Sequence, residues 1–140
     1  MRLVLDTSVI VSSVRSETGA SRFVVKAALA GRFELLVSVP LVLEYESVLM
    51  RPHQMAASRL VAEDVDELLI SLLHIGVEVN LDEYRGPSSV DLNDNHVLNL
   101  ARTGNADAIV THNVRHFKIP AGLLGVSLYT PGGVLLILED

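Results

Sequence analysis

The segment RLVLDTS, residues 2–8, decides the fold that we predict for this chain. Its apolar run Leu3–Leu5 is typical of a strand that is buried on both faces of a parallel sheet. The run ends at Asp6, whose charge is costly to bury, so we place Asp6 at the carboxyl end of the strand. Open α/β sheets bind ligands at that edge, and Thr7 and Ser8 add hydroxyl groups there. The alternative is that Asp6 only caps a following turn or helix.

Predicted strands and helices alternate along the rest of the chain. Apolar and alternating runs predict further strands at residues 33–37, 77–81, 108–111 and 126–129. Helical spacing, with Ser, Pro and Gly at the ends, predicts helices over residues 21–31, 38–51, 63–76, 94–104 and 130–138. The polar stretch 82–93 is expected to be a loop. This alternation predicts an α/β fold with a parallel sheet and helices on both faces.

The composition limits the class of protein. A chain of 140 residues with 49% hydrophobic residues is long enough for one domain with a real core, so we expect residues 1–140 to form a single domain. Cysteine is absent, which excludes disulfides and thiolate metal sites and fits a cytoplasmic protein. No signal peptide is visible, and no apolar run reaches the ~18 residues of a membrane-spanning helix. The net charge of -6 argues against a general nucleic-acid coat protein.

Acidic and amide side chains recur at the predicted strand ends and helix starts. Glu44 borders the buried face of its helix, Asp94 opens another helix with Asp91 in the loop before it, and Asn113 follows the strand at 108–111. In a doubly wound sheet these points converge on one edge, where oxygen ligands without thiolates suit Mg²⁺ or Mn²⁺. Taken singly, each acid is better explained as a surface, loop or capping residue.

Cationic and histidine side chains are also placed near strand ends. Arg15 is expected a short loop beyond the first strand, and Arg115 and Lys118 follow the strand at 108–111. His112 and His116 are four residues apart, a spacing that suggests zinc, but the third ligand of a zinc-binding motif is missing. Surface or capping histidines explain the pair better.

Four segments, in this order, resemble the motifs of PIN-domain proteins: LVLDTS at 3–8, SVPLVLEYESVL at 38–49, DLNDNHVL at 91–98 and ADAIVTHN at 106–113. The resemblance covers nearly the whole chain. It implies a three-layer α/β/α sandwich with a central, mainly parallel sheet, and a metal-dependent ribonuclease. Many bacterial and archaeal members are VapC-like toxins of toxin–antitoxin pairs. Such toxins are usually homodimers that an antitoxin covers, so the resemblance implies RNA, an antitoxin and a second copy as partners.

The resemblance also implies roles for the polar residues. Asp6, Glu44 and Asp94 fall on the family's acidic positions and are the predicted catalytic and metal-binding residues. Asn113 stands where a fourth acid is common, so a second metal position lacks a charged ligand. Ser8 stands where Asn is frequent.

Supporting roles follow for the neighbours of these acids. Hydrogen bonds to a ligand carboxylate or to the scissile phosphate are expected from Thr7, Ser8 and Thr111, and Asp91 lies near the same acids. Contacts to the RNA backbone, which need not be base-specific, are expected from Arg15, Arg115 and Lys118.

Two other readings of the sequence remain open. A phosphotransfer enzyme of the haloacid-dehalogenase kind also places an Asp after the first strand, but it expects a second Asp two positions later, where this chain has Ser8. A catalytically silent PIN-like scaffold that binds RNA or a protein partner is supported by the missing fourth acid at Asn113.

Overall fold

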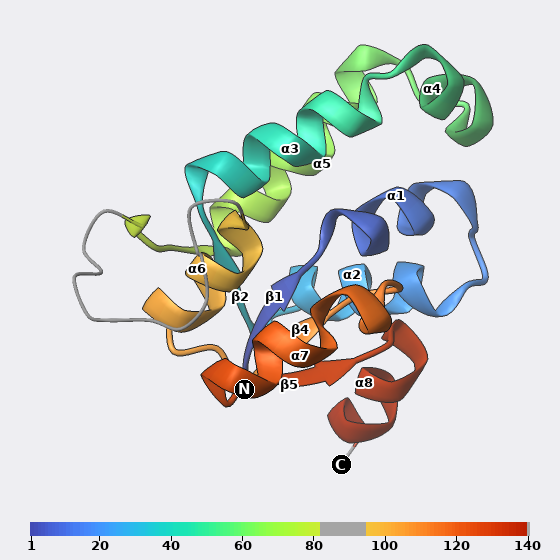
Figure 1. The fold of residues 1–140 in the computed structure, drawn as a ribbon. Coiled ribbons are helices and arrows are strands. Elements are labelled where there is room, and N and C mark those ends of the chain that lie inside the picture. The colour runs from blue at the N-terminus through green and yellow to red at the C-terminus, as the bar shows by residue number, and fades with distance from the viewer. Residues whose placement is uncertain (82–94, 140) are drawn as a thin grey trace.

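The computed structural model describes residues 1–81 and 95–139. At its centre lies a sheet of five parallel strands in the order β3-β2-β1-β4-β5 (Figure 1). The strands are β1 (Arg2–Leu5), β2 (Glu34–Val37), β3 (Val77–Glu78), β4 (Ala108–Val110) and β5 (Ser127–Tyr129). The predicted parallel sheet is therefore confirmed.

The first strand is the middle of the sheet, as its sequence indicates. Leu3 pairs in register with Leu35 of β2 on one side and with Ala108 of β4 on the other. Residues 3–5 have no solvent exposure, which agrees with the uninterrupted apolar run of a strand covered on both faces. The edge strand β3 is short and exposed. Of the predicted strand at 77–81, only the first two residues belong to β3, and the Val79 N–H still donates to the carbonyl of Val37 at 2.9 Å.

Helices cover both faces of the sheet. They are α1 (Thr7–Arg15), α2 (Ala20–Leu29), α3 (Val39–Leu49), α4 (Pro52–Ser58), α5 (Ala62–Ile75), α6 (His96–Thr103), α7 (Val114–Leu124) and α8 (Pro131–Leu138). Helix α2 contacts α5 and α8, whereas α6 contacts α7; Figure 1 shows α6 and α7 in front of the sheet and α2 behind it. The predicted α/β/α layering is confirmed. Helices α3 and α5 pack together, with α4 beyond the sheet.

Three helices were not predicted from the sequence. The segment before Arg15, expected to be a short loop, is the helix α1, because burial of Val9 and Ile10 outweighs the modest helix propensity of its serines and β-branched residues. Helix α4 begins at Pro52, where we expected only the end of the preceding helix; Pro is well tolerated at a first helical position. Helix α7 contains Pro120, which in a sequence reads as a helix breaker.

Several buried polar side chains lie at the carboxyl edge of the sheet. The buried polar residues of the described chain are Asp6, Thr7, Ser13, Ser21, Ser38 and Thr111. Asp6 and Thr7 directly follow β1, and Thr111 directly follows β4. Buried polar groups are costly unless they are hydrogen-bonded. Their hydrogen-bond partners therefore show how the side chains at this edge are oriented. In the part of the chain that the structure describes, no helix is both long and apolar enough to span a membrane.

Candidate active site

A cleft of about 270 Å³ opens at the carboxyl edge of the sheet, beside the ends of β1 and β4. The strand order reverses between these two strands, because β2 and β3 lie on one side of β1 and β4 and β5 on the other. Ligands of open α/β sheets bind at such a switch point. The cleft is lined by Asp6, Glu44, Asn95, His96, Val97, Asn113, His116 and Phe117.

Asp6 is held by hydrogen bonds to the end of β4 and to the start of α1. Its backbone N–H donates to the carbonyl of Val110 at 2.9 Å. Its Oδ2 accepts hydrogen bonds from Ser8 Oγ and Thr111 Oγ1, each at 2.8 Å. Asp6 does occupy the position before the first residue of α1, but its side chain makes no capping hydrogen bond. The capping alternative therefore does not describe the carboxylate, which is 8% exposed.

The two hydroxyl groups that hold Asp6 are themselves held by the loop after β4. The backbone N–H of His112 donates to Ser8 Oγ at 3.2 Å, and that of Asn113 donates to Thr111 Oγ1 at 2.9 Å. Because a hydroxyl group has one hydrogen, both hydroxyls accept from the backbone and give their hydrogen to Asp6. This arrangement leaves Oδ1 of Asp6 without a hydrogen bond from any described residue.

Glu44 reaches the same cleft from α3. The Thr7 hydroxyl donates to its Oε2, and His96 Nε2 lies 3.1 Å from its Oε1. The Glu44 side chain is 40% exposed, in agreement with the predicted position at the border of the buried helix face, while Glu46 on the same helix is exposed. Each Glu44 oxygen therefore has one partner, from α1 and α6.

Tyr45 fixes the two acids relative to each other, a role that the sequence did not suggest. Its ring is fully buried, and its hydroxyl donates a hydrogen bond of 2.5 Å to the carbonyl of Leu5. Leu5 directly precedes Asp6 and Tyr45 directly follows Glu44, so this one bond joins the backbone beside both carboxylates. Burial raises the pKa of the Tyr45 hydroxyl well above its ordinary value, and the nearby charges of Asp6 and Glu44 raise it further.

His96 is a second residue that sequence reasoning missed. It is the first residue of α6, and Asn95 caps this helix by accepting hydrogen bonds from the backbone of Val97 and Leu98 at 3.1 and 3.2 Å. The helix therefore begins two residues later than predicted. The signal in the sequence was a histidine two residues after a predicted acid. Its Nδ1 is shielded from solvent and has no hydrogen-bond partner in the described chain.

A family model described as PIN domain matches residues 2–115. The chain belongs to the PIN-domain family. No curated protein was found with significant similarity to it. PIN domains are generally nucleases, and they commonly use divalent metal ions. The matched range includes both acids of the cleft and Asn113.

Other predicted site residues of this PIN domain lie apart from the cleft or outside the described residues. Asp91 and Asp94 are among residues 82–94, which the structure does not describe. Arg15 lines a separate pocket at the far end of α1. Arg115 and Lys118 are exposed on α7 and do not line the cleft.

The two histidines with zinc-like spacing have different surroundings. His112 Nε2 lies 2.8 Å from Ser21 Oγ, whereas His116 lines the cleft and packs edge-on against Phe117, with 4.9 Å between ring centres. Within residues 1–81 and 95–139, no three Asp, Glu or His side chains are grouped to hold a metal ion. This pair alone therefore makes no zinc site.

The donor atoms of the cleft nevertheless suit a hard cation. Carboxylate oxygens come from Asp6 and Glu44, and Asn113 can add an amide oxygen, the ligand types that Mg²⁺ and Mn²⁺ prefer. Asn113 precedes the first residue of α7, yet its side chain makes no capping hydrogen bond, so the amide is available to the cleft. The described residues supply two of the three predicted acids.

Proposed function

We propose that this PIN domain is an Mg²⁺- or Mn²⁺-dependent endoribonuclease that hydrolyses RNA phosphodiester bonds. The observation that carries the proposal is the pair of carboxylates at the switch point of the sheet. Asp6 is oriented there by Ser8 and Thr111, and Glu44 by Thr7 and His96. Neutral hydroxyls orient the Asp6 carboxylate without neutralising its charge. A carboxylate that binds a cation must keep that charge.

The metal-binding residues in this proposal are Asp6, Glu44 and Asp94, with Asn113 as a neutral and weaker oxygen ligand toward a second ion. A bound divalent ion supplies the charge that neutralises a phosphate oxygen and lowers the pKa of water at the metal. The protein's contribution is orientation. Two hydroxyls keep Oδ2 of Asp6 engaged and leave Oδ1 free, and the Tyr45–Leu5 hydrogen bond keeps Glu44 on the same side of the cleft.

RNA would approach the cleft over α7. Arg115 and Lys118 are exposed on this helix, whose first residue directly follows Asn113. Their charges suit contacts with the sugar–phosphate backbone, which give affinity without sequence specificity.

The biological role that we propose is that of a cytoplasmic toxin of a type II toxin–antitoxin pair. PIN domains often have this role, and it brings two protein partners, a cognate antitoxin over the cleft and a second copy of the chain in a homodimer. Both partners are proposals from family membership.

The test compares two glutamates on one helix. Glu44→Gln removes a charge from the cleft, whereas Glu46→Gln makes the same chemical change two residues away, on the exposed face of α3. With Mn²⁺ present, Glu44→Gln and Asp6→Asn should lose RNA cleavage while their circular dichroism spectra stay native, and Glu46→Gln should cleave like the wild type. Unchanged cleavage by both cleft variants would refute the proposal.

A second candidate function rests on Asn113. With a neutral amide in place of a fourth acid, the chain could be a catalytically silent PIN domain that binds RNA or a partner. This candidate predicts that the wild type binds RNA but does not cleave it at any Mn²⁺ concentration, and the same assay decides between the two.

A further inference from the structure

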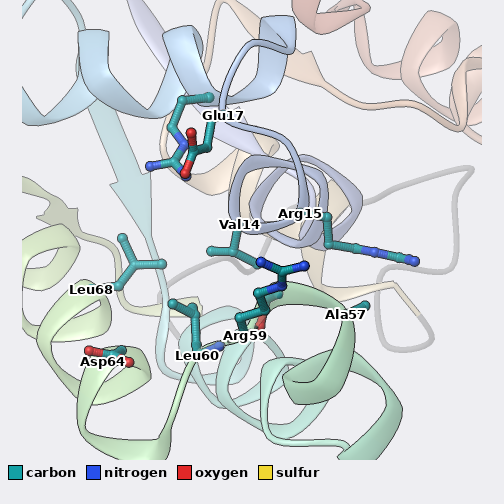
Figure 2. A pocket seen from close by; sticks show the side chains of 10 residues that line it. Val14, Arg15, Glu17, Ala57, Arg59, Leu60, Asp64 and Leu68 are labelled. Carbon is teal, nitrogen blue, oxygen red and sulfur yellow. Dashed lines mark hydrogen bonds between the residues drawn. The ribbon is translucent and has the colours of Figure 1, made fainter.

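A second pocket, of about 520 Å³, lies at the end of α1 that is far from the cleft (Figure 2). It is lined by Val14, Arg15, Glu17, Arg22, Ala57, Ser58, Arg59, Leu60, Asp64 and Leu68. Arg15 is the last residue of α1, Arg22 lies in the first turn of α2, and Arg59 directly follows α4. We call this pocket, after its three arginines, the arginine pocket. Three arginines from separate parts of the chain line this pocket, in a chain whose net charge is -6; Figure 2 shows the Arg15 side chain extending away from that of Arg59.

The arginines of this pocket have no close acidic partner in the described chain. Within the described chain, none of its three arginines forms an ion pair. The Asp64 carboxylate accepts a hydrogen bond of 2.9 Å from the backbone N–H of Val61. This bond stabilises the first turn of α5. Figure 2 shows Glu17 and Asp64 at separate edges of the pocket, away from the side chains of Arg15 and Arg59. With three arginines and two acids, the lining of the pocket carries a small excess of positive charge.

One donor of the pocket lacks an acceptor. Arg22 Nε is shielded from solvent and has no hydrogen-bond partner among the described residues. A buried donor on a charged group costs free energy when it is unpaired, and in native structures such a group commonly marks the place of a water or an ion.

The backbone at Arg59 is also unusual. Its φ of 62° and ψ of 21° are left-handed, a conformation that costs roughly 1–2 kcal/mol in a residue other than glycine. The turn ends α4, with the Arg59 N–H donating to the carbonyl of Met55 at 2.9 Å. Figure 2 shows the Arg59 side chain reaching from this turn toward Val14 of α1.

The pocket and the cleft lie at opposite ends of one helix. Helix α1 has nine residues and begins directly after Asp6, so its ends are roughly 13 Å apart at 1.5 Å per residue. A stacked strand rises about 3.4 Å per nucleotide, so this length corresponds to about four nucleotides. Guanidinium groups bind phosphate through paired hydrogen bonds.

We propose that the arginine pocket is a second RNA-binding subsite, which holds a backbone phosphate about four nucleotides from the bond at the cleft. This inference rests on the proposed function, because it assigns the pocket to the same substrate. The pocket lies at the far end of α1, the helix that begins directly after Asp6. This position favours RNA, which also reaches the cleft, over an acidic protein segment, which need not.

The test measures RNA binding rather than cleavage, with Ca²⁺ in place of Mn²⁺ to keep a cation at the cleft. The probes are two RNAs, of three and of ten nucleotides, and only the longer one can reach the arginine pocket. The variant carries Arg22→Gln and Arg59→Gln. The control carries Lys26→Gln and Arg32→Gln, which remove two positive charges that do not line this pocket.

The pocket variant should bind the ten-nucleotide RNA about tenfold or more weakly, the effect of losing one charge-assisted hydrogen bond. Its plot of log K against log salt should be shallower by about 0.7, the value for one single-strand phosphate contact. Its affinity for the three-nucleotide RNA should match the wild type, and the control should match the wild type on both RNAs.

Three outcomes would overturn the inference. They are an unchanged affinity of the pocket variant for the longer RNA, an equal loss on both RNAs, and an equal loss in the control. The first of these outcomes would leave the pocket to another ligand, such as an acidic protein segment. If the wild type binds neither RNA, the proposed function fails as well, whereas wild-type binding with an unaffected pocket variant refutes only the subsite.

Discussion

Replacing Tyr45 with phenylalanine tests how the two acids of the cleft are held together. The variant keeps the buried ring and removes only the hydroxyl, so the hydrogen bond to the carbonyl of Leu5 is lost without a large cavity. A typical hydrogen bond contributes about 0.5–1.5 kcal/mol to stability, and a buried group left unpaired costs about 1–3 kcal/mol. We therefore expect Tyr45→Phe to lower the free energy of unfolding by about 1.5 kcal/mol near neutral pH.

The pH dependence of this loss follows from the raised pKa of Tyr45. In the unfolded chain a tyrosine ionises near pH 10, while in the folded protein it stays protonated to higher pH. Its contribution is therefore complete below about pH 10. Above that pH the unfolded state binds fewer protons than the folded state, and the stability of the wild type falls by up to about 1.4 kcal/mol per pH unit. The phenylalanine variant lacks this fall, so the two stabilities should converge near pH 11.

The assay is urea unfolding followed by circular dichroism at pH 8, 10 and 11. The matched control is Tyr129→Phe, because the Tyr129 hydroxyl makes no hydrogen bond within the described residues and its removal should leave stability at pH 8 unchanged. Mn²⁺-dependent cleavage should fall mainly in kcat for Tyr45→Phe, since Glu44 loses its anchor while the RNA-binding surface is intact. A stability difference that stays constant from pH 8 to pH 11 would refute the assignment of the raised pKa to the folded tyrosine.

Two further predictions concern the metal and the RNA. Asn113→Ala should cost much less cleavage activity than Asp6→Asn, and Asn113→Asp should lower the Mn²⁺ concentration needed for half-maximal cleavage. Activity titrations show both effects; an Asn113→Ala variant as inactive as Asp6→Asn would mean that Asn113 is a principal ligand. Replacing Arg115 and Lys118 with alanine should weaken RNA binding and make its salt dependence shallower by about 1.4, at 0.7 per phosphate contact. An unaltered slope would place the RNA elsewhere.

The strands were predictable because their signal is local. Residues 3–5 and 108–110 are short apolar runs followed by polar groups, and all six residues are fully buried in the structure. Parallel strands buried on both faces can have no other pattern. Helix α1 was missed for the converse reason, because valine, isoleucine and serine dominate it and none of them favours a helix strongly. Its helical state comes from packing against α2 and α3, which no local pattern records.

The contacts within the cleft were not predictable, because they depend on side-chain directions in elements far apart in the sequence. Thr7 and Glu44 are 37 residues apart, and His96 and Glu44 are 52 apart. The sequence placed Asp6 and Glu44 at one edge from topology alone, but Tyr45 looked like one more apolar residue of the α3 stripe. Its hydrogen bond to Leu5 joins α3 to the last residue of β1, 40 residues earlier in the sequence.

The charge of the cleft bears on the order in which ligands bind. Within the described residues, no lysine or arginine forms an ion pair with Asp6 or Glu44, and the groups that hold them are three hydroxyls and the imidazole of His96. Such partners orient carboxylates and leave most of their negative charge in place. That charge attracts a divalent cation and repels a phosphate. On the proposed function, we therefore expect RNA to bind over the two acids only after a cation has neutralised them, and the exposed cations of α7 to hold its backbone beforehand.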